Sequence, residues 1–329
     1  MKPILWGVLV ARLLVVMKIQ HSFYELTSKQ PIQSKILHSL RRGALLKVTF
    51  EEGIVGYADC HPWEELGDLP LQTQLDLLQK GKCTRLTAQS IYFAHVDAKA
   101  RANKRNLLEG AKIPMSHYLM AHLDASSIVN LQKAWKNGFT FFKVKLGHNL
   151  SLEKEIFAEM AHLFPHAKWR LDFNAKLNAE QFWSFMERLL IPKTSIDYIE
   201  DPFPFTYKAW KKAFETFKVP LAADEFFKSA YGQPEAAQVL IMKPAIQRLK
   251  QVDIRQRLIV TSYLDHPLGQ MSAAYMASLT TQEPCGLLSH HIYQNNPFSG
   301  MISNQGPFLQ PVQGYGLGFD ELLASQHYE

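Results

Sequence analysis

The feature that most constrains the fold of this chain is an alternation of short apolar runs with helix-like stretches after residue 112. Strands that alternate with helices form parallel sheets, and eight strands are enough to close a barrel. An open, doubly wound sheet is the alternative, but no glycine-rich loop follows the first strands, which argues against a dinucleotide-binding version. The eight expected strands lie within residues 113–120, 139–147, 168–174, 195–203, 219–226, 239–245, 257–264 and 285–292.

Residues 17–110 lack this alternation and predict a separate α+β capping domain. The barrel domain is expected at 111–300, and the C-terminal segment 301–329 is expected to pack back on the capping domain. Within the capping domain we expect strands at 44–50 and 54–60 around a turn at Glu51-Glu52-Gly53, followed by helices at 71–81 and 87–105. In the barrel, helices are predicted after cap residues Ser151 and Asn178.

Charge and cysteine content exclude several classes of protein. The net charge is +6, and no Lys/Arg run predicts a nucleic-acid-binding arm. The three cysteines are far apart, which predicts neither a disulfide framework nor a zinc knuckle and fits a cytoplasmic location. The apolar segment 4–16 contains Arg12 and is too short to span a bilayer. We expect residues 1–16 to be an extension before a start at Met17, with a membrane-surface anchor as the alternative and no stable membrane insertion.

Charged residues recur near the ends of the predicted strands. Their separations correspond to about one βα unit, so they are expected at equivalent places on successive strands, at the barrel edge where active sites are built. Lys143 and Lys145 are one residue apart and therefore share a strand face. The complete series is Lys143, Lys145, Asp172, Glu200, Asp224 and Lys243.

Three carboxylates at one edge would repel one another unless a cation lay between them. Ligands that are all carboxylate oxygens favour Mg²⁺, with Mn²⁺ as a possible substitute. Crowded lysines lower one another's pKa, which makes a lysine a usable base near neutral pH. A cation beside a lysine base suits removal of a proton α to a carboxylate, so a small carboxylate is the expected substrate.

The motifs in these runs resemble the muconate-lactonizing subgroup of the enolase superfamily. The resemblance covers nearly the whole chain after residue 16 and implies a modified (β/α)8-type barrel, (β/α)7β, under an N-terminal capping domain. RLD at 170–172 is similar to the o-succinylbenzoate synthase family within this subgroup. The motifs that carry the resemblance are KVK at 143–145, LDFN at 171–174, IEDP at 199–202, ADE at 223–225 and MKP at 242–244.

The resemblance implies a role for each charged residue. Asp172, Glu200 and Asp224 would bind Mg²⁺. Lys145 would take the α-proton and return it to the departing hydroxyl, while Lys243 would stabilise the enediolate and Lys143 would act through electrostatics and orientation. The implied reaction dehydrates 2-succinyl-6-hydroxy-2,4-cyclohexadiene-1-carboxylate to 2-succinylbenzoate in menaquinone biosynthesis.

Further residues are expected around this centre. Arg170, Thr261 and Ser262 are candidates for substrate binding, although a buried ion pair with a barrel acid is an alternative for Arg170. His266-Pro267 departs from the family pattern. Residues beside the ligands, namely Asn174, Asp201 and Glu225, are expected to support the ligands or the loops.

Other functions remain open. An N-acylamino acid racemase or dipeptide epimerase could use the same lysines, but the run GLLSHHIYQNN lacks the Asp-x-Asp with which such epimerases hold an ammonium group. A Schiff-base aldolase would use Lys145 or Lys243 as its nucleophile and would need no acid triad. A binding protein that retains the barrel would not need every lysine and acid in place. The oligomeric state is not predicted.

Overall fold

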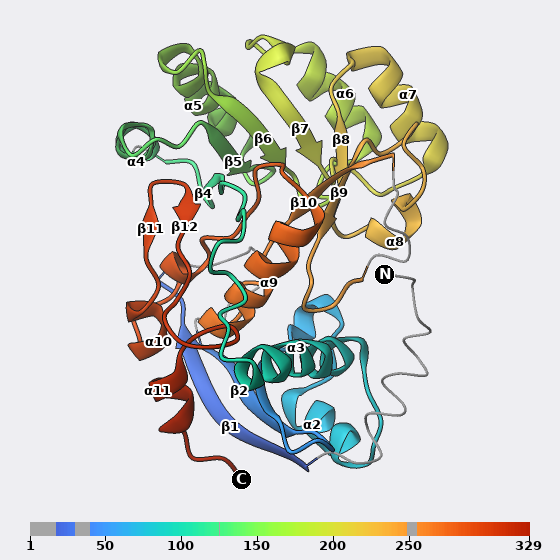
Figure 1. The fold of residues 1–329 in the computed structure, drawn as a ribbon. Coiled ribbons are helices and arrows are strands. Elements are labelled where there is room, and N and C mark those ends of the chain that lie inside the picture. The colour runs from blue at the N-terminus through green and yellow to red at the C-terminus, as the bar shows by residue number, and fades with distance from the viewer. Residues whose placement is uncertain (1–17, 30–39, 125, 249–254) are drawn as a thin grey trace.

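The computed structural model describes residues 18–29, 40–124, 126–248 and 255–329 (Figure 1). The predicted extension, residues 1–16, lies outside the described residues. Among the helices of these ranges, none has the length and apolar character needed to cross a bilayer.

The capping domain contains an antiparallel sheet in the order β1-β2-β3. The predicted hairpin is confirmed: Phe50 N–H donates to Ile54 O over 2.9 Å, and Gly53 adopts the positive φ of 73° that the turn requires. Helix α3 packs so closely on β3 that a Cβ at Gly56 would lie 1.9 Å from Ala94 O. The elements are β1 (Lys18–Thr27), β2 (Leu40–Thr49), β3 (Val55–Cys60), α2 (Leu71–Gln79) and α3 (Arg85–Ala102).

The barrel domain contains a parallel sheet that, over the described residues, has seven strands in the order β10-β9-β8-β7-β6-β5-β4. Helices of this domain cover the outer face of the sheet (Figure 1). The strands are β4 (Tyr118–Met120), β5 (Phe141–Lys145), β6 (Lys168–Asp172), β7 (Ile196–Glu200), β8 (Leu221–Ala223), β9 (Val239–Met242) and β10 (Arg257–Val260). The main helices are α4 (Ser127–Lys136), α5 (Leu150–Leu163), α6 (Ala179–Glu187), α7 (Tyr207–Phe217), α8 (Phe227–Ala230) and α9 (Pro267–Thr280).

The prediction of an eighth strand at residues 285–292 is wrong, although this segment does connect the two edges of the sheet. Cys285 and Gly286 form isolated parallel bridges, one to Ser116 before β4 and the other to Thr261 after β10. The run then turns into a short 3-10 helix, His290–Ile292, so its apolar residues never extend along either edge. The two bridges connect both edges of the sheet, which is therefore closed by a short contact.

The predicted helix starts are half correct. Asn178 caps α6 and exchanges hydrogen bonds with Gln181 in a capping box. Ser151 is inside α5, because Asn149 provides the cap by accepting a hydrogen bond from Leu152 N–H.

The C-terminal segment runs back along the first sheet (Figure 1). The backbone of Glu329 exchanges hydrogen bonds of 3.1 and 2.9 Å with that of His21 in β1. Arg101 on α3 pairs with both Asp97 and Asp320. The segment contains α10 (Pro297–Gly300), β11 (Asn304–Gln305), β12 (Phe308–Leu309) and α11 (Asp320–Ala324).

Candidate active site

The strand register brings the predicted charged residues to one edge of the barrel. Lys145 pairs with Asp172 in the ladder between β5 and β6, and Asp172 pairs with Glu200 between β6 and β7. Asp224 and Lys243 directly follow β8 and β9. The spacing that the sequence shows therefore becomes proximity at the C-terminal ends of the strands.

Lys143 is the buried cation of this edge. Its Nζ lies 2.6 Å from Glu200 Oε1 and 3.0 Å from Asp172 Oδ2, and the residue is only 8% exposed. Burial alone would lower the pKa of Lys143, but the two carboxylates raise it well above its ordinary value. Lys143 therefore stays charged and neutralises the acids, which explains why a buried strand carries it.

The two acids respond differently to the shared lysine. Burial raises the pKa of Asp172, but Lys143 and Lys145 outweigh burial and hold that pKa below its usual value. Burial and the charge of Asp172 raise the pKa of Glu200 to about 7. Glu200 Oε2 is buried and has no hydrogen-bond partner within the described ranges. A buried carboxylate oxygen without a partner is a position that a cation would satisfy.

The third acid, Asp224, forms an ion pair with Lys243, in which Nζ and Oδ2 are 2.5 Å apart. Both residues line the cavity at the barrel mouth. Each predicted metal ligand therefore contacts a lysine ammonium group in this structure.

These three acids have the right ligand atoms for a divalent metal, but their side chains are not arranged around a common metal position in this structure. Within the described residues, no three His, Cys, Asp or Glu side chains are close enough together to hold a metal ion. However, Asp172, Glu200 and Asp224 supply the hard oxygen ligands that Mg²⁺ prefers, and Glu200 Oε2 awaits a partner. The three acids thus fit Mg²⁺, and its binding would require Lys143 and Lys243 to give up some of their ion pairs with the acids.

Lys145 has the electrostatic environment of a base. It lines both cavities described below. Burial lowers its pKa, and the charges of Lys143 and Lys243 lower it further against the opposing charge of Asp172. A lysine with a lowered pKa is neutral more often near neutral pH, as proton abstraction requires.

Two adjoining cavities of about 260 and 90 Å³ occupy the mouth. Trp63 and Leu66 reach the cavities from the capping domain. Trp63 Nε1–H donates to Tyr263 O over 2.8 Å, and Asp68 accepts from both Trp63 N–H and the Tyr263 hydroxyl. These contacts fasten the capping loop to the segment after β10. The cavities share Leu66, Lys145, Asn174, Asp224, Lys243 and Tyr263.

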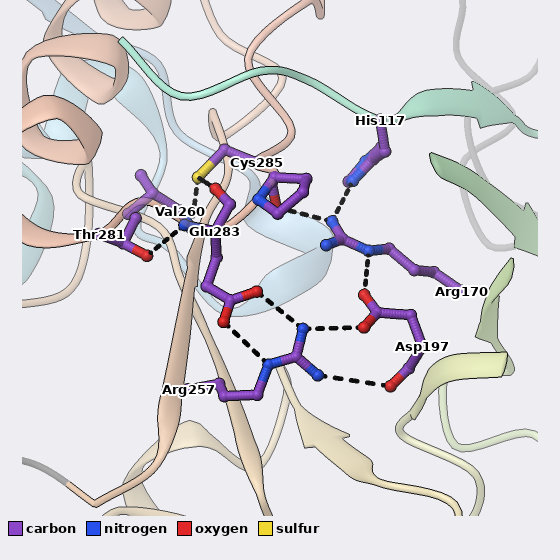
Figure 2. A network of polar contacts seen from close by, with 9 residues as sticks. His117, Arg170, Asp197, Arg257, Val260, Thr281, Glu283 and Cys285 are labelled. Carbon is purple, nitrogen blue, oxygen red and sulfur yellow. Dashed lines mark hydrogen bonds and ion pairs between the residues drawn. The ribbon is translucent and has the colours of Figure 1, made fainter. Parts of the chain in front are cut away.

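The predicted substrate-binding residues separate into two groups. Thr261 and Ser262 line the smaller cavity, and their buried hydroxyl oxygens lack a hydrogen-bond partner among the residues described. Arg170 does not line either cavity. It is fully buried and its Nε donates to Asp197 Oδ2 over 2.8 Å (Figure 2). Arg170 therefore forms the buried ion pair that was the alternative to substrate binding.

The residues beside the acids form hydrogen bonds that fix the loops after β6 and β8. Asn174 N–H donates to Asp172 Oδ1 over 3.0 Å. Asp201 accepts from the N–H groups of Asp224 and Glu225, at 3.2 and 2.8 Å. Asp201 has a positive φ of 38° and lines the larger cavity. Glu225 lines the larger cavity.

Many residues that line the cavities were not predicted, among them His117, Leu66 and Tyr263. No motif in the sequence marks the side chains of the capping domain that reach the cavity. His117 and Tyr263 lie in predicted strand runs whose register alone could have placed them at the mouth.

Comparison with known proteins decides the family. The family described as "O-succinylbenzoate synthase, N-terminal domain" matches residues 19–100, and "Enolase C-terminal domain-like" matches residues 127–248. An o-succinylbenzoate synthase from Bdellovibrio bacteriovorus is 35% identical over 93% of this chain and 96% of its own length. The chain belongs to the o-succinylbenzoate synthase family. It is therefore an enzyme, a carbon–oxygen lyase of the enolase superfamily, as the motifs indicated.

More distant relatives share the family's sequence or fold. An o-succinylbenzoate synthase from Thermosynechococcus vestitus is 24% identical over 83% of this chain and 91% of its own length. The muconate lactonizing enzyme from Pseudomonas putida superposes with a TM-score of 0.70 at 17% identity, covering 94% of this chain and 98% of that one. The L-Ala-D/L-Glu epimerase from Bacillus subtilis gives 0.74 at 15% identity, covering 92% and 98%. These structures confirm the barrel and capping fold.

Proposed function

We propose that this enzyme is a Mg²⁺-dependent o-succinylbenzoate synthase. It would convert 2-succinyl-6-hydroxy-2,4-cyclohexadiene-1-carboxylate to 2-succinylbenzoate for menaquinone biosynthesis. The observation that carries the proposal is a single cavity lined by Lys145, whose pKa is lowered, and by the ion pair of Lys243 with Asp224. The relative from Bdellovibrio supports the choice of reaction within the superfamily.

Asp172, Glu200 and Asp224 would hold the cation. When bound, Mg²⁺ would withdraw electron density from the substrate carboxylate and so acidify the adjacent C–H bond. Lys143 lies between two of these acids and would remain an ammonium group, balancing the charge that the cation leaves uncompensated.

Lys145 performs the proton transfers. Its neutral amine accepts the α-proton as the C–H bond breaks, and the resulting ammonium then protonates the hydroxyl on the neighbouring carbon as the C–O bond breaks. A double bond forms, water leaves and the ring becomes aromatic. One lysine can serve both steps when the proton and hydroxyl leave from the same ring face.

Lys243 stabilises the negative charge that accumulates between these steps. It lines both cavities and is ion-paired with Asp224, and binding of the cation by Asp224 would leave its ammonium group available to a substrate oxygen. Trp63, Leu66 and Tyr263 cover the mouth and would exclude water from the reacting ring.

Racemisation or epimerisation is the competing function. Those reactions also begin with α-proton abstraction, and a lysine on each side of the cavity could serve them. The residues of 285–292 that line the smaller cavity are Gly286, Leu288, Ser289 and Ile292, so this wall offers no carboxylate to a substrate ammonium group. This favours the dehydratase.

The test is turnover by the purified enzyme. We expect Mg²⁺-dependent conversion of the cyclohexadiene carboxylate, followed by ultraviolet absorbance, that EDTA abolishes and added Mg²⁺ restores. No turnover of this compound, together with rapid exchange of the α-proton of an N-acylamino acid or a dipeptide, would assign the enzyme to the competing function. Trapping of a substrate adduct by borohydride would instead indicate an aldolase.

A further inference from the structure

His117 lies immediately before β4 and lines the smaller cavity. It is 7% exposed and lines this cavity together with Thr261 and Ser262. Its Nδ1 is 2.9 Å from Nη1 of Arg170 (Figure 2). No role in the reaction proposed above requires this residue.

The contact with Arg170 fixes the tautomer of His117. A guanidinium nitrogen can only donate, so Nδ1 must be the acceptor. Burial and the charges of Arg170 and Lys143 lower the pKa of His117 well below its ordinary value, so the ring is neutral. A neutral ring whose Nδ1 accepts carries its proton on Nε2. His117 therefore has one available donor, Nε2–H.

Arg170 is itself held rigidly. Its Nε donates to Asp197 and its Nη1 also donates to Pro284 O, both over 2.8 Å. Asp197 is in turn paired with Arg257, which also pairs with Glu283 at 2.8 Å (Figure 2). The network crosses the barrel interior and leaves Nη1 little freedom to move away from His117.

Gly286 allows His117 to approach the two hydroxyl residues. A Cβ at this position would lie 2.9 Å from Thr261 Cγ2, 3.0 Å from His117 Cε1 and 3.1 Å from His117 Nε2. A side chain at this position would therefore crowd both Thr261 and the imidazole edge that carries Nε2. The hydroxyls of Thr261 and Ser262 are also without partners within the described chain. The His117 imidazole and the hydroxyls of Thr261 and Ser262 therefore line the same cavity, where each can bond to a ligand.

We propose that His117, oriented by Arg170, donates a hydrogen bond from Nε2 to an oxygen of the substrate's succinyl side chain and so contributes to specificity for that side chain. The identity of this ligand rests on the proposed function. Arg170 is then a positioning residue: it acts on the substrate through the tautomer of His117, although it does not reach the cavity.

The binding test compares two ligands and two variants. We expect His117→Leu to weaken binding of 2-succinylbenzoate by about 10-fold, the usual loss for one buried hydrogen bond, and to leave binding of benzoate within about 2-fold. His117→Gln can place an amide N–H near the position of Nε2 and should recover most of the affinity. In turnover, KM should rise more than kcat falls. Equal weakening of both ligands by His117→Leu would overturn the proposal.

The tautomer test does not depend on turnover. Nitrogen NMR of the ¹⁵N-histidine-labelled wild-type enzyme should show His117 protonated at Nε2 and unprotonated at Nδ1. Arg170→Met should shift this signature and also weaken 2-succinylbenzoate more than benzoate, while Arg170→Lys, which retains a donor, should restore part of both. A wild-type proton on Nδ1 would contradict the proposal even if the enzyme is an o-succinylbenzoate synthase. Absence of turnover with the expected tautomer and ligand preference would refute only the assigned reaction.

Discussion

Replacing Lys143 by Met tests whether this lysine neutralises the acids of the site. Methionine keeps much of the side-chain volume but removes the ammonium group that lies 2.6 Å from Glu200 and 3.0 Å from Asp172. At pH 6 the metal-free protein would then contain the buried Asp172 carboxylate without the ammonium group that it shares with Glu200. Because this substitution breaks a buried ion pair from one side, we expect a loss of about 3 kcal/mol in the free energy of unfolding at pH 6.

The loss should grow with pH. The pKa of Glu200 is already raised to about 7, and removal of Lys143 raises it further. Below pH 7 Glu200 is protonated in both folded proteins, so it adds little to their difference. Above pH 7 only the wild type ionises Glu200, and the variant loses relative stability by about 1.4 kcal/mol for each further pH unit. At pH 8.5 the total loss should therefore reach about 5 kcal/mol.

Urea unfolding of EDTA-treated protein at pH 6 and 8.5 measures both quantities. Lys208→Met is the control, because Lys208 is exposed on α7 and its removal should change stability by less than about 0.5 kcal/mol. Saturating Mg²⁺ should reduce the defect of the variant, since the cation can replace the missing charge. A loss at Lys143 no larger than the control, or one that is independent of pH, would refute the neutralising role.

Three further substitutions test other parts of the account. Lys145→Ala should reduce turnover by at least about 10²-fold and leave Mg²⁺ affinity, measured by calorimetry, within a few-fold; parallel loss of both would show that Lys145 supports the metal site instead. Asp59 and Asp265 lie between the two domains; burial raises the pKa of Asp59 to about 7, and burial together with the charge of Asp59 raises the pKa of Asp265. Stability is therefore lost as pH rises from about 4 to 7, and Asp265→Asn should be more stable than wild type by about 1.4 kcal/mol at pH 7.5 but not at pH 4, as urea unfolding would detect. A difference that does not change with pH would show that the pKa of Asp265 is not raised in the folded protein. Trp63→Leu removes the hydrogen bond to Tyr263 and should lower kcat/KM by about 10-fold in steady-state assays; unchanged kinetics would show that the loop needs no such fastening.

The fold and the charged edge were predictable because both depend on spacing. Parallel strands place their C-terminal ends at one edge, so residues about one βα unit apart, such as Asp172 and Glu200, had to become neighbours. The closing element was harder to predict. Its apolar composition resembles a strand, but strand formation depends on the pairing partners, and Cys285 and Gly286 find theirs on two different edges.

The fate of individual polar side chains was not predictable. The alternation of β6 directs Arg170 inward, but its partner Pro284 is 114 residues away in sequence and no local pattern indicates it. The same holds for His117, whose run carries no motif and whose donor atom depends on Arg170. Which lysine pairs with which acid also follows from barrel geometry, as the contact of Lys143 with Glu200 shows across 57 residues.

Anomalous diffraction from a crystal of this enzyme soaked with Mn²⁺ and 2-succinylbenzoate tests the central claim most directly. We predict one strong peak coordinated by Asp172, Glu200 and Asp224, with the benzoate carboxylate beside it and Lys145 and Lys243 on opposite sides of the aromatic ring. A peak bound by other residues, or none at saturating Mn²⁺, would contradict the proposed metal site and the mechanism built around it.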